Sequence, residues 1–387
     1  MPPGAHALLS PSAYSRWSHC TAAPHYEQQF EESSSEYAAE GTLAHEICEL
    51  KVLKHIGKIN QRQYSTRLAK IKKHELFQPE MLKTSDVYLD VIRELEMEHA
   101  GYTIAMPEVR LDISAYIPEC HGTSDCVIVS PTALTVVDYK HGKGVPVSAE
   151  GNGQMRIYAL GALAYFKPIF GDGIKTVAMA IVQPRLSESP SIETISTEEL
   201  LAWGEELKPI AREAFYGPGK FNPSEKACRF CRGKAVCSAR AKVNLAMEEF
   251  KQFDHDKLTN EQIGDLLSRG KDLAAWYKDL EEYALKAGLA GQQIPGYKVV
   301  AGRSNRRFRD EEEAMTALCN IVSDPDTLYT VKPKSLSELE KMIDKDAFEA
   351  AVGSLIVKPY GKPVLVPESD KREPYSSAEA DFGGVAG

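Results

Sequence analysis

The sequence lacks any apolar run of the roughly 20 residues that a membrane-spanning helix needs. Its first residues, MPPGAHALLSPSAYSRW, lack the basic and then apolar order of a secretory signal. We therefore expect a cytoplasmic protein with no membrane partner, in a compartment that keeps thiols reduced. In such a compartment the eight cysteines serve as metal ligands or as small core residues rather than in disulfides.

The chain also lacks an excess of positive charge. It has 46 Lys and Arg against 55 Asp and Glu, a formal net charge of −9 at pH 7. This balance excludes a histone-like coat of positive charge, but a DNA enzyme can confine its cations to one face. With 43% hydrophobic residues over 387 positions, the chain is long and apolar enough for one large folded domain with smaller additions.

Hydrophobic periodicity predicts a mixed α/β core in the order α-β-β-β-α-β. Gly122 and the pair Pro131-Thr132 separate the predicted strands as turns. Runs with helical spacing cover residues 36–57, 80–99, 152–167 and 197–215, and alternating runs cover residues 103–117, 124–130, 133–140 and 174–183.

Beyond this core we expect three further parts. A cysteine-rich loop at 222–240 closes the main domain, which is predicted to cover residues 1–240. The predicted parts after it are a helical connector over 241–293, a small α+β appendage over 294–366 and a mobile tail over 367–387.

The connector is expected to hold a helix over 260–288 that begins at a capping box of Thr259 and Gln262. Its apolar stripe includes Ile263, Leu267 and Tyr277. Such a stripe predicts packing against the rest of the protein rather than a functional site.

Two carboxylates and a lysine are predicted to meet at neighbouring strands. GTSDC and VVDYKHGKG lie on strands joined by a tight turn, which brings Asp125 and Asp138 side by side. Asp138 and Lys140 are two residues apart in a strand, so their side chains project from the same face. Paired carboxylates suit a hard cation such as Mg²⁺ or Mn²⁺, with the carbonyl of Tyr139 as a further ligand.

Lys140 beside such a metal could orient or help deprotonate the attacking water and stabilise charge on the phosphorane. The alternative is an ordinary ion pair between Asp138 and Lys140 at a strand end. The tripeptide DxK by itself is too common to decide between the two.

Other polar residues at helical spacing lie before and after this pair. His45 and Glu49 are four residues apart and share a helix face, from which the neutral imidazole of His45 could complete the metal's coordination. Gln154 and Tyr158 are also four apart, on the helix after the DxK strand, where they could hold a phosphate or a base edge. Glu108 is a further carboxylate that could reach a second metal. For each of them a purely structural role is the alternative.

In this order, the patterns GxxxHxxxE, GxxD, DxK and QxxxY resemble the motifs of the RecB-like nucleases of the PD-(D/E)XK superfamily. The resemblance covers roughly residues 12–240, and four motifs in order are far more specific than any one of them. It implies a restriction-endonuclease-like core, a mixed sheet flanked by helices, and hydrolysis of DNA phosphodiesters with one or two Mg²⁺ or Mn²⁺ ions. The matching residues are Gly41, His45, Glu49, Gly122, Asp125, Asp138, Lys140, Gln154 and Tyr158.

Three cysteines with C-x2-C-x5-C spacing, Cys228, Cys231 and Cys237, lie in ACRFCRGKAVC. A site with four ligands needs another, and Cys20 lies in a segment that is otherwise unexplained. This layout resembles the iron–sulfur branch of the RecB-like nucleases, which includes the AddB nuclease domain and the CRISPR-associated RecB-like exonucleases. By that match the four cysteines hold a [4Fe–4S] cluster that staples the ends of the domain together. Zn²⁺ is the alternative occupant.

The C-terminal part has basic residues that suit nucleic acid. Arg303, Arg306 and Arg307 lie near Phe308, and guanidinium groups beside aromatic rings contact phosphates and stack on bases. A solvated basic turn, neutralised by the acidic run that follows, is the alternative. The segment KPVLVPESDKREPYSSAEADF is similar to the C-terminal signature of a phage-encoded protein family, which suggests a place in phage recombination or replication.

Together these features predict a metal-dependent DNA exonuclease that acts at single- or double-stranded ends in the cytoplasm of a bacterial host or phage-infected cell. A single-strand annealing or single-strand-binding protein is the expected partner. The alternative is a catalytically silent DNA-end-binding or scaffold protein of the same system, although a silent site has no physical reason to keep a buried charge cluster. A redox- or iron-responsive regulator would leave the carboxylates without a purpose.

Overall fold

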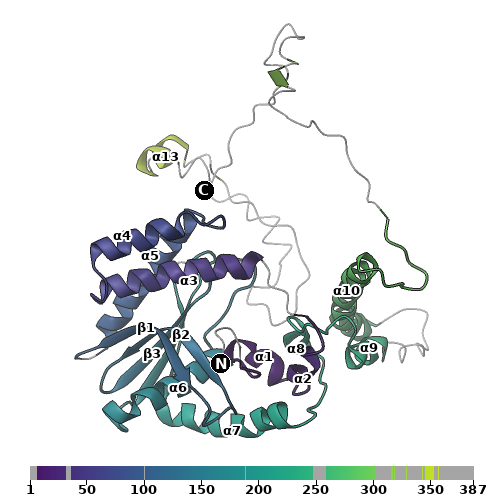
Figure 1. Ribbon diagram of the computed structural model, residues 1–387, viewed down its shortest axis with the longest axis horizontal. Helices are drawn as coiled ribbons and strands as arrows, with labels where there is room; N and C mark the ends of the chain where they lie inside the picture. Colours follow the sequence, from purple (N-terminus) through teal and green to yellow (C-terminus); the bar gives the residue numbers. More distant parts are fainter. Residues whose placement is uncertain are drawn as a thin grey trace. The chain divides into compact units, whose positions relative to one another are not determined.

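The computed structural model describes residues 7–31, 36–99, 101–187, 189–246 and 259–300, together with residues 315, 316, 318, 328, 342, 345–352 and 356. The chain divides into two compact units, Met1–Val300 and Ala301–Gly387. In the second unit the structure describes helix α13 (Lys345–Val352). The predicted tail lies outside the described residues, and so does most of the predicted appendage (Figure 1). No helix in the described segments is long and apolar enough to cross a membrane.

A five-stranded mixed sheet forms the centre of the first unit, in the order β1-β2-β3-β4-β5. Strands β3 and β4 are parallel and the other neighbours are antiparallel. Helix α6 (Gly153–Phe170) makes the crossover that a parallel pair requires. The strands are β1 (Ile104–Asp112), β2 (His121–Val129), β3 (Ala133–Tyr139), β4 (Thr176–Val182) and β5 (Ser191–Ser196).

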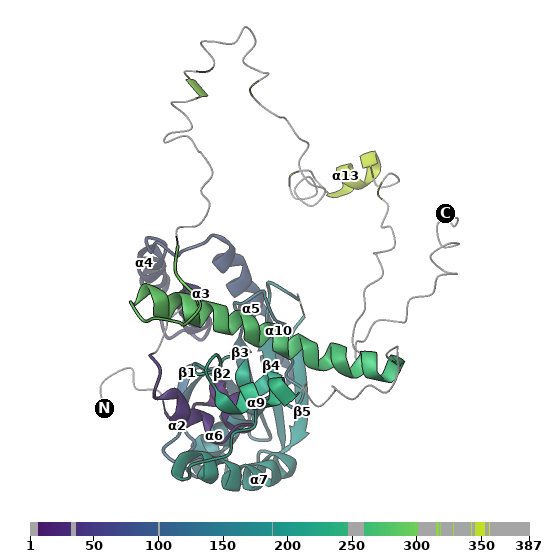
Figure 2. The same ribbon diagram turned by 90° about the vertical axis from the view of Figure 1, so that its right-hand side faces the viewer.

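Helices cover both faces of this sheet (Figures 1 and 2). One apolar cluster joins the sheet to α3 (Glu36–His55), α4 (Gln61–Ile71) and α5 (Glu80–Glu98), and the other joins it to α6 and α7 (Thr197–Tyr216). Because both faces are covered, strand β3 is buried along nearly its whole length. The chemistry-bearing residues therefore have to lie at strand ends or at the edge strand.

Several short helices from the two ends of the unit lie together. Helix α1 (Tyr14–Trp17) packs against α8 (Glu225–Cys228), which follows it by about two hundred residues. The chain continues through α9 (Ser238–Leu245) to the long helix α10 (Asn260–Leu289). The remaining short elements are η1 (Pro11–Ala13) and α2 (Ala23–Glu27).

The predicted packing stripe on α10 is only partly covered. Ile263, Leu267 and Tyr277 are exposed, whereas the other members of the same stripe are half-buried: Leu266, Leu273, Leu280 and Ala284. The helix also docks through Trp276, whose indole N–H donates to the carbonyl of Ala235 at 2.9 Å. Hydrophobic spacing shows which side chains share a helix face, but the partner surface decides whether that face is covered. The capping box that begins α10, Thr259 with Gln262, is present as expected.

The other differences from the prediction are two elements that it missed and two strand boundaries. Helix α4 and strand β5 were not expected, because α4 has few apolar residues and β5 (SIETIS) is a short, polar edge strand. Strand β2 begins at His121 rather than 124, and β1 ends at Asp112 rather than 117. Helix α7 is capped by Ser196, whose hydroxyl accepts from the N–H of Glu199.

Close packing of α6 against β1 gives a stability test. A Cβ at Gly161 would lie 2.8 Å from Ile113 Cγ1 and 3.0 Å from Leu111 Cβ, whereas a Cβ at Gly264 in α10 would meet no atom within 4 Å. We expect Gly161→Ala to lower the free energy of unfolding by about 1–3 kcal/mol, because overpacking forces neighbours to shift.

Gly264→Ala is the matched control, and we expect it to be neutral or stabilising by up to about 1 kcal/mol, because Ala is the better helix former. Urea denaturation of both variants measures the difference. Equal stability of the two would show that α6 does not pack on β1 this closely.

Candidate metal centre

The site forms where β1, β2 and β3 come together. Glu108 of β1 lies across from Asp125 of β2, between the paired residues Pro107↔Cys126 and Val109↔Ser124. The ladder between β2 and β3 ends at Cys126↔Val137, one position before Asp125 and Asp138 would face each other. The two aspartates therefore emerge at the point where these strands separate.

Glu108 has a left-handed backbone, with φ of 52°. A residue other than glycine in this region costs on the order of 1–3 kcal/mol and is often found at functional sites. Met106 and Val109 both point to the α6 side of the sheet, although they are three residues apart. Side chains of a regular strand return to the same face every two residues, so β1 has one extra residue at Glu108. The extra residue lies on an edge strand, where a distorted ladder is tolerated.

A histidine and two carboxylates converge at this distortion. One ligand atom from each of His45, Glu108 and Asp125 lies within 4.8 Å of the others. His45 Nδ1 is 3.2 Å from Asp125 Oδ1, and the backbone N–H of Tyr139 donates to Asp125 Oδ2 at 2.7 Å. A group of this composition fits a divalent metal site, because carboxylate oxygens and imidazole nitrogen are common ligands of such ions.

Asp138 and Lys140 lie beside this group, on the side of the sheet that α6 covers. Lys140 Nζ is 2.9 Å from Asp138 Oδ2 and donates to Gln154 Oε1 at 3.3 Å. Gln154 Nε2 in turn donates to Asp138 Oδ1 at 3.1 Å. Asp138 is buried, and both of its carboxylate oxygens are engaged within the chain, Oδ1 by Gln154 and Oδ2 by the ammonium group of Lys140.

Burial and mutual repulsion set the protonation of the carboxyl groups. Burial raises the pKa of Glu108 to about 7, with further contributions from the negative charges of Asp125 and Glu49. Burial also raises the pKa of Asp138, partly offset by the positive charge of Lys140. Both groups would ionise more readily if a cation lay between them.

The carboxylates raise the pKa values of both bases of the site. Burial alone lowers the pKa of His45, but the hydrogen bond to Asp125 and the charges of Asp125 and Asp138 outweigh it and raise the pKa. For Lys140, burial is likewise outweighed by Asp138 and Asp125, which raise the pKa. Lys140 is therefore an ammonium ion at neutral pH.

Tyr158 packs beneath the site and is buried rather than exposed. Its side chain is buried, burial raises its pKa above the usual range, and Gln154 hydrogen-bonds to it. A Cβ at Gly122 would lie 2.9 Å from Tyr158 Cε1 and 3.1 Å from Pro11 Cγ. The glycine of the GxxD pattern thus allows the aromatic ring to approach β2.

A network that the sequence did not reveal holds the end of β3 from the other face. The hydroxyl of Tyr139 donates to Thr84 at 2.8 Å and lies 3.0 Å from His141 Nδ1. His141 Nε2 is 3.0 Å from Glu40 Oε1, and Arg185 Nη1 is 3.1 Å from the same oxygen. Glu40, Thr84 and Arg185 come from three separate segments, so only the fold brings them to Tyr139 and His141. The His141 that directly follows the DxK motif is the one local signal.

The four predicted cluster cysteines line one small pocket, with Ala23, Phe221 and other apolar residues around them. All four are buried and none forms a disulfide. The backbone N–H of Asn222 donates to Cys20 Sγ at 3.5 Å. The pocket members are Cys20, Cys228, Cys231 and Cys237.

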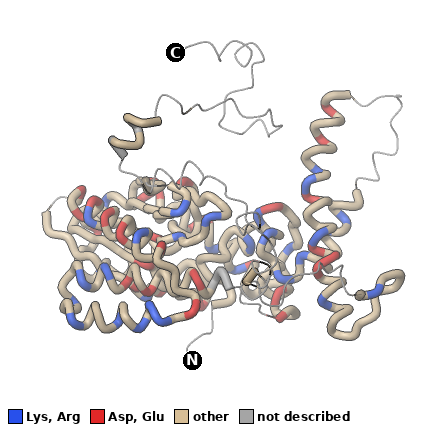
Figure 3. The backbone as a smooth tube through the Cα atoms, turned by 90° about the horizontal axis from the view of Figure 1, so that it is seen from above, with Lys and Arg blue, Asp and Glu red and all other residues tan. Residues whose placement is uncertain are grey.

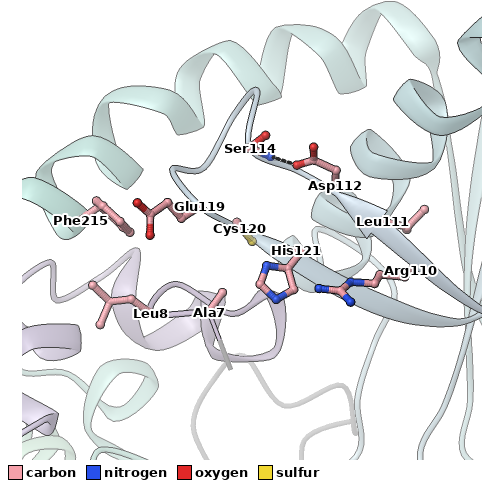
Figure 4. Close-up of a pocket in the computed structure, with 10 residues that line it drawn as sticks. All are labelled: Ala7, Leu8, Arg110, Leu111, Asp112, Ser114, Glu119, Cys120, His121 and Phe215. Atoms are coloured by element: carbon pink, nitrogen blue, oxygen red, sulfur yellow. Dashed lines mark hydrogen bonds between the residues drawn. The ribbon is translucent and has the colours of Figure 1, made fainter. Parts of the chain in front are cut away.

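A larger open cavity of about 810 Å³ lies at the turn end of the β1–β2 hairpin (Figure 4). Arg110 and His121 line it together with Asp112 and Glu119, beside Leu8 and Phe215. None of the predicted site residues lines it. The predicted nucleic-acid residues Arg303, Arg306 and Arg307 lie outside the described residues.

Comparisons with known proteins give a family and several distant solved structures, two of which are described below. Residues 6–373 match the profile of the family described as "Protein of unknown function (DUF2800)". A crystal structure described as "Putative exonuclease" from Eubacterium rectale is 16% identical, with a TM-score of 0.35, over 63% of this chain and 93% of its own. The structure of SSO0001 is 13% identical, with a TM-score of 0.24, over 50% of this chain and 95% of its own.

The raised pKa of Glu108 predicts how the metal-free protein responds to pH. Because the folded pKa of about 7 lies above the ordinary value of 4.5, the wild type loses stability as the pH rises from 4.5 to about 7. We expect Glu108→Gln to raise the melting temperature relative to wild type at pH 8, and much less at pH 5, where Glu108 of the folded protein is still neutral.

With Mn²⁺ at pH 8 the wild type should melt at a higher temperature than Glu108→Gln, because only the wild type offers the ion the full set of ligands. Glu206→Gln, on the exposed side of α7, is the control and should follow the wild type throughout. Thermal unfolding at the two pH values, with and without metal, measures all three proteins. A Glu108→Gln variant that Mn²⁺ stabilises as much as the wild type would exclude Glu108 as a ligand.

Proposed function

We propose a function for this chain, which belongs to the family described as "Protein of unknown function (DUF2800)": it is a metal-dependent deoxyribonuclease with a restriction-endonuclease-like core. The observation that carries the proposal is the meeting of the His45, Glu108 and Asp125 group with the Asp138, Lys140 pair where β2 and β3 separate. An ordinary structural ion pair would need only Asp138 and Lys140, without the other three residues. The motif resemblance to RecB-like nucleases supports the same chemistry.

The ligands of one or two Mg²⁺ or Mn²⁺ ions would be His45, Glu108, Asp125 and Asp138, with the carbonyl of Tyr139. When bound, the ion supplies a Lewis acid for the phosphodiester and lowers the pKa of water. The distorted backbone at Glu108 directs its carboxylate toward Asp125, and the N–H of Tyr139 fixes the second oxygen of that aspartate. The ligand atoms are thereby positioned before any ion binds.

Lys140 acts as an electrostatic stabiliser rather than as a base. Its pKa is raised, so its ammonium group stays charged and can offset negative charge on the phosphorane or give a proton to it. Asp138 and Gln154 hold that ammonium group from two directions. Tyr158 supports Gln154 from below, a positioning role rather than contact with substrate.

The finer proposal is an exonuclease that acts on single- or double-stranded DNA ends in phage recombination or replication, in the cytoplasm. A single-strand annealing or binding protein would take over the strand that is left. The motif resemblance and the C-terminal similarity to a phage-encoded family support this part. A silent DNA-end-binding scaffold remains the competing function, and cleavage decides between them.

The central test is divalent-ion-dependent degradation of linear DNA. We expect wild type to degrade end-labelled DNA with Mg²⁺ or Mn²⁺, and Asp138→Asn and Lys140→Met each to lose activity by on the order of 10²–10³-fold or more, as removal of charge stabilisation typically does. Lys175→Gln, an exposed lysine before β4, is the control and should keep wild-type activity. A time course on single- and double-stranded DNA with each ion measures the rates.

Metal binding separates the two roles. Lys140→Met should still bind Mn²⁺, whereas Asp125→Asn should not. A folded wild type that binds DNA ends but cuts none with any divalent ion would overturn the nuclease proposal in favour of the scaffold.

We further propose that Cys20, Cys228, Cys231 and Cys237 hold a [4Fe–4S] cluster, with Zn²⁺ as the alternative. The shared pocket, the absence of disulfides among these four and the N–H donated to Cys20 Sγ suit a thiolate site. Its role would be structural, because it joins the start of the domain to residues more than two hundred positions later. Closing so long a loop restricts the unfolded chain strongly.

Iron content tests the cluster. We expect wild type purified without oxygen to be brown with about four irons per chain, and Cys20→Ser to lose most of the iron and to melt at a lower temperature. Cys126→Ala, a fully buried cysteine in the α3 and α5 cluster, should lose stability but keep its iron. A colourless wild type with one bound zinc would replace the iron–sulfur assignment by zinc.

A further inference from the structure

Residues 50–74 form the most one-sided charge segment of the described chain. They contain eight Lys or Arg and no Asp or Glu, in a protein whose net charge is −9. Cationic and anionic side chains are interspersed along most of the rest of the described chain (Figure 3), and in the other acid-free stretch, residues 226–246, Lys234 and Arg240 pair with Asp279 of α10. An acid-free stretch of this length therefore needs an explanation of its own.

Helix α4 presents this charge to solvent. Its inner side, with Tyr64, Leu68 and Ile71, lies toward α3 and the apolar cluster there. The helix lies on the side of α3 away from the sheet (Figure 1). Six exposed cations lie on and beside its outer surface, which we call the α4 surface: Lys58, Arg62, Arg67, Lys70, Lys72 and Lys73.

These six cations have no ion-pair partner in the part of the chain that the structure describes. Two acids of the neighbouring helix α5 are already used: Asp86 pairs with Lys51, and Glu96 pairs with His55 at 2.6 Å. Arg62 and Lys70 are eight residues apart, about 12 Å along a helix, so the charges form a row rather than a point. Unneutralised charges in a row raise the local potential and favour a polyanion over a small anion.

We propose that the α4 surface binds the phosphate backbone of nucleic acid. Cations spread along a helix can contact several phosphates of one strand, and the release of counterions would supply the affinity. The surface reads no sequence, because its side chains are flexible and its partners are phosphates.

The α4 surface is separate from the candidate metal centre but joined to it through one helix. His45 and Glu49 face the site from α3, and Lys54 of the same helix contacts the Tyr64 ring of α4 at 4.7 Å. His45 and Lys54 are about 14 Å apart along the helix axis, or roughly four nucleotides of one strand. The inference rests on the proposed nuclease for the identity of its ligand, and it extends the substrate contact beyond the cleaved bond.

Salt-dependent binding by the full chain tests the α4 surface without cleavage. We expect a 40-base-pair duplex, in EDTA, to bind Arg62→Gln/Lys70→Gln/Lys73→Gln about 10-fold or more weakly than wild type at 0.1 M salt, with the slope of log Kd against log salt lowered by about two to three. The control is Lys167→Gln/Lys175→Gln/Lys226→Gln, which makes the same change in net charge at exposed lysines elsewhere. It should bind within about twofold of wild type. Fluorescence anisotropy measures both quantities.

Unchanged affinity and slope in the α4 variant, or an equal loss in the control, would overturn the inference. Tighter binding of wild type to polyglutamate than to DNA would also overturn it, in favour of an acidic protein partner. A wild type that binds DNA through these cations but cuts none keeps the α4 surface and contradicts the nuclease. Cleavage by the wild type, together with unchanged DNA binding by the α4 variant, keeps the nuclease and contradicts the α4 surface.

Discussion

Repulsion among carboxylates at one end of the sheet is the constraint that the site has to satisfy. The pKa values of Glu108 and Asp138 are both raised, by burial first and then by the negative charge of Asp125 beside them. A protein with no use for this cluster would be more stable without it. Part of the cost is offset within the chain by Lys140 and His45, and the rest is left for a cation.

Helices on both faces of the sheet hold the residues of the site in place. From one face α3 supplies His45, and Glu40 of the same helix joins the His141 and Arg185 network that fixes the end of β3. From the other face α6 supplies Gln154, which bridges Asp138 and Lys140. A strand end held from both sides keeps its carboxylates in place without help from a flexible loop.

The cysteine pocket brings together two segments of the first unit that are distant in the sequence. It joins Cys20 in the first helices to the loop before α9, and Trp276 of α10 bonds to the carbonyl of Ala235 in that same loop. Arg240 of α9 adds ion pairs to Asp272 and Asp279, at 3.1 and 2.7 Å. Anything that opened the pocket would therefore also loosen the long helix, because both depend on one loop.

The sequence by itself determined helices α3, α5, α6 and α7, strands β1 to β4, and the shared face of Asp138 and Lys140, because these follow from local periods of 3.6 and 2 residues. Only the tertiary structure decided that Glu108 turns left-handed across from Asp125, that Arg185 joins the network behind the site, and that Trp276 docks α10 on the loop before α9. Those features depend on residues distant in the chain. A local pattern shows which way a side chain projects, but not what it meets there.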